Sequence, residues 1–385
     1  MEQYNLHQGD KKMDIAAYYF PNYHADKRNE EYRGPGWTEW ELMKCARPRF
    51  EGHRQPKIPA WGYEDEADPQ VMAQKIDTAA AYGIDAFVFD WYWYDGAFLE
   101  RALKEGYLNA PNKEKIKFAI MWANHDWHDR HPTGYMNTLD PRKLYLWSSK
   151  ADSIGFVWDY LIENYFTRPE YWYVDGKPYF SIYSINRFIQ QMGGIQETQK
   201  VLNLLREKAI KAGLAGIHIN AVWFDNLTLQ KFCINNGEGY DIAGFDSYTS
   251  YNSVGTTKVW QEEFPIVDFK QAADEYIELS KTFFEKLSKP YFPVASVGWD
   301  SSPRTIQSEI YRPGGYPFMP VMESNPDELL NLLEALKLQL ANVPKQEQII
   351  FINAWNEWTE GAYLEPDTYW GYKLLEKVKE FAQKC

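Results

Sequence analysis

Short apolar runs rich in β-branched and aromatic residues recur along the chain, and most are separated by stretches whose apolar residues have helical spacing. Eight runs are typical of buried strands: 15–23, 84–93, 117–124, 178–184, 216–223, 242–249, 292–299 and 349–355. The helical pattern covers 69–82, 153–165, 196–212, 269–287, 327–342 and 369–384. Alternating strands and helices indicate an α/β fold with a parallel sheet, and eight such units predict a single (β/α)8 TIM barrel.

The barrel is expected to form one catalytic domain over residues 14–385, after a polar N-terminal tail at 1–13. Its first βα loop, at 23–68, is long and is expected to fold over the C-terminal face of the barrel. The competing fold is a doubly wound open sheet. That fold would place a glycine-rich turn after the first strand, whereas residues 21–24 read P-N-Y-H.

Polar and aromatic residues gather where the predicted strands end and are scarce where the strands begin. In a (β/α)8 barrel, the carboxyl ends of the strands meet on one face, and the active site forms there. The sequence therefore predicts a cleft on this face, lined by Tyr19, Trp91, Trp93, Asn124, Trp299 and Trp355. A register slip of one residue would turn any of these side chains to the opposite face of its strand.

Aromatic residues make up 17% of the chain, which is more than a core usually needs. Tyrosine and tryptophan combine a flat apolar face with a polar group, and such faces suit the C–H faces of sugar rings. The net charge of -13 would repel phosphate backbones, so no nucleic acid partner is expected. The same charge argues against a polyanionic polysaccharide, unless the fold hides a local basic patch.

No apolar run approaches the ~20 residues of a membrane helix, so no membrane span is expected. The N-terminal stretch is polar and lacks the apolar segment of a signal peptide. The protein is therefore either cytoplasmic, or secreted or periplasmic after removal of a signal. Cys45, Cys233 and Cys385 lie far apart and are expected to be free thiols. The sequence does not indicate an oligomeric state.

Two glutamates, Glu357 and Glu360, follow the last predicted strand and are flanked by Trp355 and Trp358. In a helical turn, a spacing of three places side chains about 5–6 Å apart at Cβ. Retaining glycosidases hold their two carboxyl groups roughly 5–5.5 Å apart. Two close carboxyl groups in an apolar setting cannot both ionise easily, so one pKa rises and that group can act as an acid. The alternative is a surface loop with two solvated glutamates.

The segment 355–361 reads W-N-E-W-T-E-G and resembles the W-N-E-W-x-E-G signature of glycoside hydrolase family 99 and its WbsX-like relatives, which are often labelled glycosyltransferases. Further segments resemble the same group, at 36–40, 50–56, 82–87, 298–304 and 362–367. One segment departs from it. The group usually has W-A-N-E-N-W after the third strand, whereas residues 122–127 read W-A-N-H-D-W. His125 therefore replaces the usual glutamate, and any substrate contact of that glutamate is in doubt.

The resemblance implies a retaining glycoside hydrolase that acts on a polysaccharide or glycan without a metal or cofactor; in family 99 itself the substrate is an α-mannoside. By the same resemblance, Glu360 is the general acid and then the base. Glu357 removes the proton of the sugar's 2-hydroxyl, and this oxygen attacks the anomeric carbon to give a 1,2-anhydro sugar. A covalent glycosyl-enzyme remains the alternative route. Endo or exo action, the sugar and the linkage stay open.

The substrate-binding residues expected from these arguments are Tyr19, Glu39, Asp90, Trp91, Trp93, Asn124, His125, Asp126, Trp299, Asp300, Trp355 and Asn356. For Glu39 the alternative is a structural ion pair, and for Asp300 it is a salt bridge to Arg304. The histidines at 125, 128 and 131, with two nearby aspartates, have spacings that could hold a metal. No fourth ligand is fixed elsewhere, so no metal is expected, and a loop that binds sugar hydroxyls is preferred.

Two other classes of function remain as alternatives. A glycosyltransferase in surface-polysaccharide synthesis would need a diphosphate site, such as a pair of metal-binding aspartates or a glycine-rich helix N-terminus, and the sequence shows no convincing one. A non-catalytic carbohydrate-binding protein would have no need for both Glu357 and Glu360.

Overall fold

The computed structural model describes residues 13–138, 141–147, 154–223, 243–254 and 258–385. The polar tail expected at 1–13 falls almost wholly outside the described residues, as do Cys233 and residue 242 of the sixth predicted strand.

The centre of the molecule is a parallel sheet whose neighbouring strands follow the order β11-β10-β9-β8-β4-β2-β1-β13-β12. The strands are β1 (Asp14–Tyr19), β2 (Ala86–Trp93), β4 (Lys117–Trp122), β8 (Lys177–Ile182), β9 (His218–Trp223), β10 (Ser247–Ser250), β11 (Tyr291–Phe292), β12 (Val294–Ser296) and β13 (Ile349–Asn353). Pro293 divides the seventh strand into β11, which pairs with β10, and β12, which pairs with β13. The sheet thereby closes on itself, and the predicted (β/α)8 barrel is confirmed.

Each of the eight strand predictions overlaps an observed strand, but several were too long. The predicted first strand continued to residue 23, whereas β1 ends at Tyr19 and residues 20–23 leave the sheet. The predicted third strand likewise ends earlier, because β4 stops at Trp122. The extra residues belong to the loops of the C-terminal face. These loops are as rich in aromatic residues as the strands, so the sequence pattern did not mark where each strand ends.

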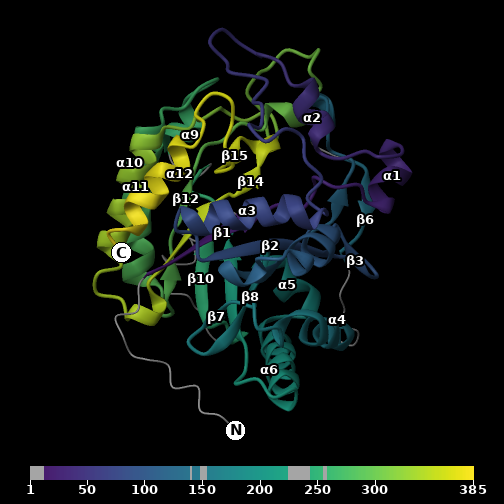
Figure 1. The fold of residues 1–385 in the computed structure, drawn as a ribbon, viewed down its shortest axis with the longest axis vertical. Coiled ribbons are helices and arrows are strands. Elements are labelled where there is room, and N and C mark those ends of the chain that lie inside the picture. Colours follow the sequence, from purple (N-terminus) through teal and green to yellow (C-terminus); the bar gives the residue numbers. More distant parts are fainter. Residues whose placement is uncertain (1–12, 139–140, 148–153, 224–242, 255–257) are drawn as a thin grey trace.

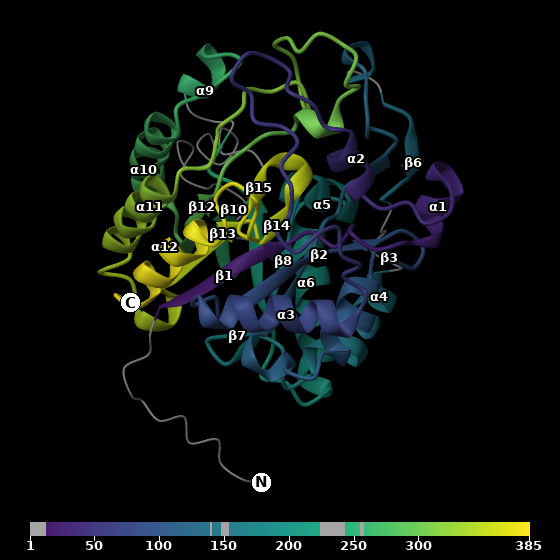
Figure 2. The ribbon, with the colours of Figure 1, turned by 45° about the horizontal axis from the view of Figure 1, so that its top comes forward.

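Helices pack around the outside of the sheet, as predicted (Figure 1). They are α3 (Pro69–Ala81), α4 (Ile154–Leu161), α6 (Ile195–Lys211), α10 (Phe269–Lys286), α11 (Pro326–Gln339) and α12 (Lys373–Ala382). Asp68 and Asn325 cap α3 and α11, each followed by proline in the first turn. Figures 1 and 2 both place α10, α11 and α12 side by side along one side of the barrel. Within the described ranges, no helix has the length and apolar character needed to span a bilayer.

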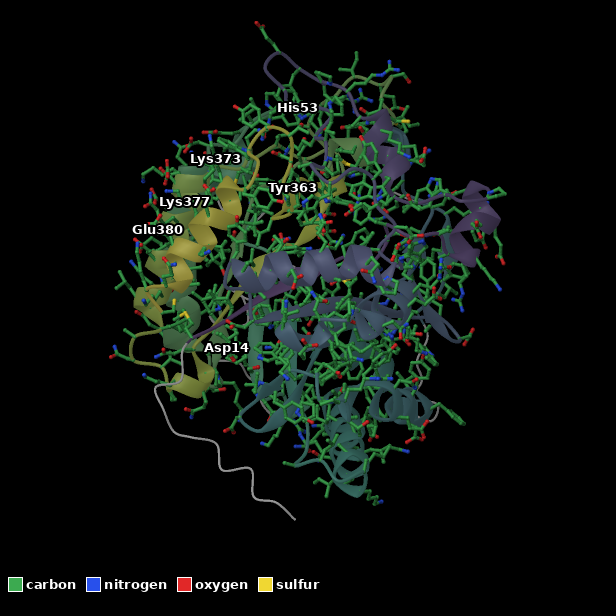
Figure 3. The ribbon with its side chains drawn as sticks, in the orientation of Figure 1. Asp14, His53, Tyr363, Lys373, Lys377 and Glu380 are labelled. Atoms are coloured by element: carbon green, nitrogen blue, oxygen red, sulfur yellow. The ribbon has the colours of Figure 1, made fainter. Side chains whose placement is uncertain are left out.

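The long first loop contains two helices that were not predicted, α1 (Lys27–Arg33) and α2 (Trp40–Cys45). It lies over the C-terminal face, where the backbone N–H of Ala60 donates to the carbonyl of Pro366 at 2.8 Å. Figure 3 shows His53 of this loop far from Asp14, which begins β1 at the opposite end of the barrel. Two further helices, α5 (Ile185–Met192) and α9 (Lys258–Glu262), follow strands on the same face.

Aromatic rings fill the inside of the barrel. Tyr18 stacks on Phe351 with ring centroids 5.1 Å apart, and Phe351 also contacts Tyr179 and Phe292. These side chains come from β1, β13, β8 and β11, so four strands contribute to one packed layer. Much of the aromatic excess is therefore core, and a smaller part lines the cavity described next.

Candidate active site

Glu357 and Glu360 lie just beyond the end of β13, on a small antiparallel hairpin. Its arms are β14 (Asn356–Glu357) and β15 (Ala362–Tyr363), and a single 3-10 turn, Trp358–Glu360, joins them. The turn brings both carboxyl groups to the C-terminal mouth of the barrel, where they are 4% and 6% exposed. The alternative of a solvated surface loop is therefore wrong.

Asn356 fixes this hairpin to the first strand. Its side-chain amide donates to the carbonyl of Phe20 at 2.9 Å, and its side-chain oxygen accepts from the backbone N–H of Phe20 at 2.8 Å. The asparagine thus pairs with Phe20 as a neighbouring strand would, beyond the point where β1 and β13 stop pairing. Asn356 holds the backbone next to Glu357 in place and does not line the cavity.

Gly361 ends the turn that carries Glu360. Its φ of +65° lies in the left-handed region, which glycine adopts at little cost. A Cβ at this position would lie 2.7 Å from the backbone nitrogen of Asp300, so a side chain is excluded by contact as well. The close approach allows the N–H of Asp300 to donate to the carbonyl of Glu360 at 2.5 Å. The last glycine of the W-N-E-W-T-E-G segment is thereby explained.

The two glutamates face a cavity of about 600 Å³ on the C-terminal face. This volume is within the roughly 300–1,000 Å³ typical of small-molecule sites. Of the predicted site residues, the cavity is lined by Glu39, Asp90, His125, Asp126, Trp299, Glu357 and Glu360. Seven others do not line it: Tyr19, Trp91, Trp93, Asn124, Asp300, Trp355 and Asn356.

Strand register explains most of these misplacements. Asp90 and Tyr92 of β2 line the cavity, so Trp91 and Trp93 between and beyond them point to the other face. There Trp91 contacts Trp93 and Tyr160, with ring centroids 5.4 and 6.2 Å away. These two tryptophans pack the barrel against its outer layer.

Tyr19 and Trp355 were also predicted to line the cavity, and they do not. Tyr19 is fully buried and donates its hydroxyl to Glu66 at 2.8 Å, while the next residue, Phe20, lines the cavity. Trp355 is also fully buried and packs on Phe87, with ring centroids 5.0 Å apart. Both serve the core.

Asn124 binds backbone and does not reach the cavity. Its side-chain oxygen accepts from the N–H of Ser184 at 2.7 Å, and its amide donates to the carbonyl of the same residue at 2.9 Å. It therefore links the ends of β4 and β8, while its neighbours Ala123 and His125 line the cavity.

Asp300 belongs to a buried cluster behind the site. It contacts His53 at 2.9 Å, Gln55 at 2.6 Å and the ammonium of Lys57 at 3.6 Å. Burial alone would raise the pKa of Asp300, but Lys57 and the hydrogen bond from His53 hold this pKa below its usual value. The expected salt bridge to Arg304 is wrong, since Arg304 pairs with glutamates instead.

Two sets of side chains among the residues that the structure describes contain the donor types of a metal site. His53, Asp300 and Glu323 come within 4.8 Å of one another, but Lys57 lies 3.5 Å from Glu323 and 3.6 Å from Asp300 and supplies positive charge there. The three histidines at 125, 128 and 131 do not form a set of this kind. The donors present therefore fit hydrogen bonding better than metal ligation.

Arg304 connects the acidic groups of the site. Its Nη1 donates to Oε1 of Glu360, its Nη2 lies 3.5 Å from Oε1 of Glu357, and its Nε donates to Oε1 of Glu39 at 3.0 Å. Glu39 also accepts from Thr359 at 2.7 Å. Glu39 is thus both a cavity residue and the ion-pair partner that orients Arg304.

Burial dominates the ionisation of the pair. It raises the pKa of Glu357 well above its usual range; the charge of Glu360 adds to this, and Arg304 opposes it. Burial also raises the pKa of Glu360, but Arg304 and a hydrogen bond from Tyr316 at 2.8 Å limit the rise. Both shifts favour protonation of the pair, and the stronger rise favours the proton on Glu357.

Tyr251 extends this network to Asp90. Its hydroxyl donates to Oε2 of Glu357 at 2.7 Å and lies 3.3 Å from Oδ2 of Asp90. The hydroxyl has a single proton, so its shorter contact with Glu357 is the stronger hydrogen bond and the contact with Asp90 is weaker. Burial raises the pKa of Asp90 well above its usual value, and the hydrogen bond from Tyr251 opposes this rise.

Several cavity residues were not predicted: Phe20, Tyr92, Arg187, Tyr251, Arg304 and Tyr316. Tyr251 follows β10 directly, so the rule used for the other strand ends could have found it. Arg304 stood in a segment already recognised at 298–304 but was assigned a different partner. Tyr316 lies in a loop whose sequence carries no comparable signal.

Solved structures with a similar barrel include glycoside hydrolases. The glycoside hydrolase family 99 endo-α-mannosidase from Bacteroides thetaiotaomicron has a TM-score of 0.59 at 14% identity, over 96% of each chain. A glycoside hydrolase-like protein has a TM-score of 0.60 at 15% identity, over 97% of this chain and 94% of that one. At this identity, the likeness establishes the fold.

Residues 15–378 match the family model described as Glycosyltransferase WbsX, and the chain belongs to this family. The family resemblance of the sequence segments is thereby confirmed. An uncharacterized protein of Xanthomonas campestris pv. campestris strain B100, WxcX, is 28% identical over 376 residues, which cover 95% of this chain. The match covers 49% of WxcX, so the chain spans about half the length of this relative.

Proposed function

We propose that the protein is a retaining glycoside hydrolase that cleaves a polysaccharide or glycan with the pair Glu357 and Glu360. The observation that carries this proposal is the geometry of the pair: two buried carboxyl groups, three residues apart, face one cavity and share the single guanidinium of Arg304. Such a pair can supply one proton donor and one proton acceptor to the same bond.

In the proposed first step, Glu360 protonates the glycosidic oxygen while Glu357 takes the proton of the sugar's 2-hydroxyl. The 2-oxygen forms a bond to the anomeric carbon, the bond to the leaving group breaks, and a 1,2-anhydro sugar results. In the second step Glu360 removes a proton from water, and the water oxygen attacks the anomeric carbon. The bond from this carbon to the 2-oxygen breaks, which opens the three-membered anhydro ring, and Glu357 returns its proton to the 2-oxygen. Two displacements at one carbon retain its configuration.

The first step needs the proton on Glu360, whereas the free protein favours it on Glu357, and substrate binding can account for this difference. The proton of the pair is favoured on Glu357 before substrate enters. A glycosidic oxygen can only accept a hydrogen bond, so it favours protonated Glu360. A 2-hydroxyl can donate, so it favours ionised Glu357. The substrate therefore moves the proton across the pair into the arrangement that the first step needs.

The walls of the cavity supply surfaces for sugar rings. Tyr92, Trp127, Tyr183 and Trp299 all line it. Aromatic faces stack on the C–H faces of pyranoses, and phenol and indole groups can form hydrogen bonds with sugar hydroxyls. An α-mannoside is one candidate substrate, because the endo-α-mannosidase of Bacteroides thetaiotaomicron shares the fold.

Glycosyl transfer from a nucleotide sugar is the second candidate, because the family description names a glycosyltransferase. The test is incubation of the protein with α-mannans, bacterial surface glycans and nucleotide sugars, with NMR of the products. We expect cleavage of a glycan and first formation of the product anomer that matches the substrate. Consumption of a nucleotide sugar only in the presence of an acceptor would instead establish transfer, and binding without any turnover would establish a carbohydrate-binding protein.

A further inference from the structure

One wall of the cavity carries an excess of positive charge. Arg130 and Arg187 line this wall together with a single carboxylate, Asp126. Asp126 is paired twice, with Arg187 and with Lys143 at 3.0 Å, so this group of three retains a positive charge.

A second carboxylate, Asp129, directly precedes Arg130 in the chain, does not line the cavity and is also paired twice. Asp129 contacts Arg33 at 3.0 Å and Arg142 at 2.9 Å. Four cations, Arg33, Arg142, Lys143 and Arg187, are thus paired with these two carboxylates, in a chain whose net charge is -13. The fold therefore forms a local basic patch, which is the condition under which an anionic glycan fits a chain of this overall charge.

Arg130 is the arginine of this wall whose charge is not balanced by a nearby carboxylate of the described residues. No ion pair to Arg130 occurs among the residues that the structure describes, and its Nε is buried without a hydrogen-bond partner there. An arginine side chain offers five N–H donors in a planar fork that matches a carboxylate or a phosphate. This side chain is therefore available to an anionic group of a ligand.

Helix α5 adds to the same wall. It begins directly after Ser184, and Ser184 and Arg187 both line the cavity. No side chain caps the start of this helix. A helix N-terminus carries a partial positive charge and attracts anions, so it acts in the same direction as the arginines.

Burial favours the neutral form of two histidines of this wall, His125 and His131, and in neither form does a histidine bring negative charge to it. Burial, with smaller effects of His128, Arg187 and Arg130, lowers the pKa of His125 to about 4. Burial and nearby arginines also lower the pKa of His131 well below its usual value. His125 stands where the resembling group usually has glutamate, so a neutral side chain occupies a position at which a carboxylate would repel an anion.

We propose that this wall is a subsite for an anionic substituent of the glycan, with Arg130 and Arg187 as its ligands. The substituent is the carboxylate of an acidic sugar or a phosphate ester, since both offer the paired oxygens that arginine binds. The proposal rests on the proposed function in that the anionic sugar is part of the cleaved glycan. Repulsion from Glu357 and Glu360 would keep the anionic group at the basic wall and so fix the direction of the chain in the cavity.

Binding to a variant that cannot turn over substrate tests the subsite. The background is the double variant Glu357→Gln, Glu360→Gln, whose fold is checked by circular dichroism. The probes are oligosaccharides that contain a uronic acid, the same oligosaccharides after chemical reduction of the carboxylate, phosphorylated oligosaccharides, and nucleotide sugars. Isothermal titration calorimetry gives each Kd at low and high salt.

We expect the acidic or the phosphorylated oligosaccharides to bind at least about tenfold more tightly than their neutral counterparts, and this preference to shrink with added salt. Arg130→Gln and Arg187→Gln should each reduce the preference to roughly threefold or less, since each removes a charge-assisted hydrogen bond. Lys200→Gln, which removes one charge from the exposed face of α6, should leave it unchanged.

Equal binding of the charged and neutral forms, or a preference that survives in both arginine variants, would overturn the subsite. So would tighter binding of nucleotide sugars than of any glycan. If the unaltered protein cleaves neutral glycans while the charged forms gain no affinity, the subsite alone is wrong. If the preference holds but no glycan is cleaved, the proposed hydrolysis is wrong and the subsite stands.

Discussion

Arg304 donates a hydrogen bond to Glu360, and the same guanidinium lies 3.5 Å from Glu357. Arg304 is only 4% exposed, and its third partner, Glu39, is buried as well. A single buried cation therefore lowers the pKa of both carboxyl groups, against the rise that burial causes.

The two glutamates should respond differently to the leaving group. Glu360→Gln should slow cleavage of poor leaving groups by roughly 10²–10⁴-fold, because a basic departing oxygen needs a proton, and should spare activated aryl glycosides. Glu357→Gln should be severe for every leaving group, because the attacking oxygen then keeps its proton. Steady-state kinetics on a series of aryl glycosides measures this. Equal losses in both variants on all substrates would refute the division of roles.

Removal of Arg304 should move the pH–rate profile to higher pH. Arg304 lowers the pKa of Glu357 and of Glu360, so without it both groups hold their protons to higher pH. The profile of kcat/KM against pH for Arg304→Gln should therefore rise and fall at higher pH than that of the unaltered protein. Arg304→Lys keeps the charge and should shift the profile less. A profile of Arg304→Gln that coincides with that of the unaltered protein would show that this cation does not set the ionisation of the pair.

Glu357→Gln should increase stability above acidic pH. Burial raises the pKa of Glu357 in the folded protein above the 4.5 of the unfolded chain, so the folded state favours the protonated form. The stability gained from this form is fully present below pH 4.5 and is lost as the pH rises through the pKa of the folded protein. The amide does not ionise and avoids this loss. We expect a gain of roughly 1 kcal/mol near neutral pH that shrinks toward pH 4.

Thermal unfolding of the two proteins across this pH range measures the difference. Glu207→Gln, a change at an exposed position of α6, serves as the control and should show no such trend. A constant difference between Glu357→Gln and the unaltered protein at all pH values would contradict the prediction.

Two glycine variants separate backbone strain from steric contact. Gly361 and Gly371 both have positive φ, +65° and +57°, but a Cβ at Gly371 meets nothing within 4 Å, whereas one at Gly361 lies 2.7 Å from Asp300. Gly371→Ala should cost roughly 1–2 kcal/mol, the price of the left-handed conformation. Gly361→Ala should cost more and should also reduce kcat, because the turn that carries Glu360 must move. Chemical denaturation and kinetics on both variants give the comparison, and equal effects would show that contact with Asp300 is unimportant.

The sequence was sufficient for the barrel because each strand and helix has a local pattern of its own, as with α3 after Asp68-Pro69. It also placed the glutamate pair, because Glu357 and Glu360 lie three residues apart in one turn. The cavity wall was harder. Whether Trp91 or Tyr92 faces inward depends on the register of β2 within the closed sheet, and both residues fit either face.

Partners far apart in the chain were also beyond reach. Arg304 lies 265 residues after Glu39, and no local pattern indicates that they pair. The basic wall is a similar case, since Arg33, Asp126 and Arg187 come from separate loops and helices. Total charge averages over the whole surface and conceals such local concentrations.

The order of the strands has a consequence for how activity arises during folding. β13, which leads into Glu357 and Glu360, is the last barrel strand in chain order and pairs with β1, so residues 14–17 align with residues 349–352. Contacts of such sequence separation form late, because a very long loop must be closed first. Until β13 inserts between β12 and β1, neither Glu357 nor Glu360 is held at the mouth of the barrel. The proposed activity would therefore begin only when the ring of strands is complete.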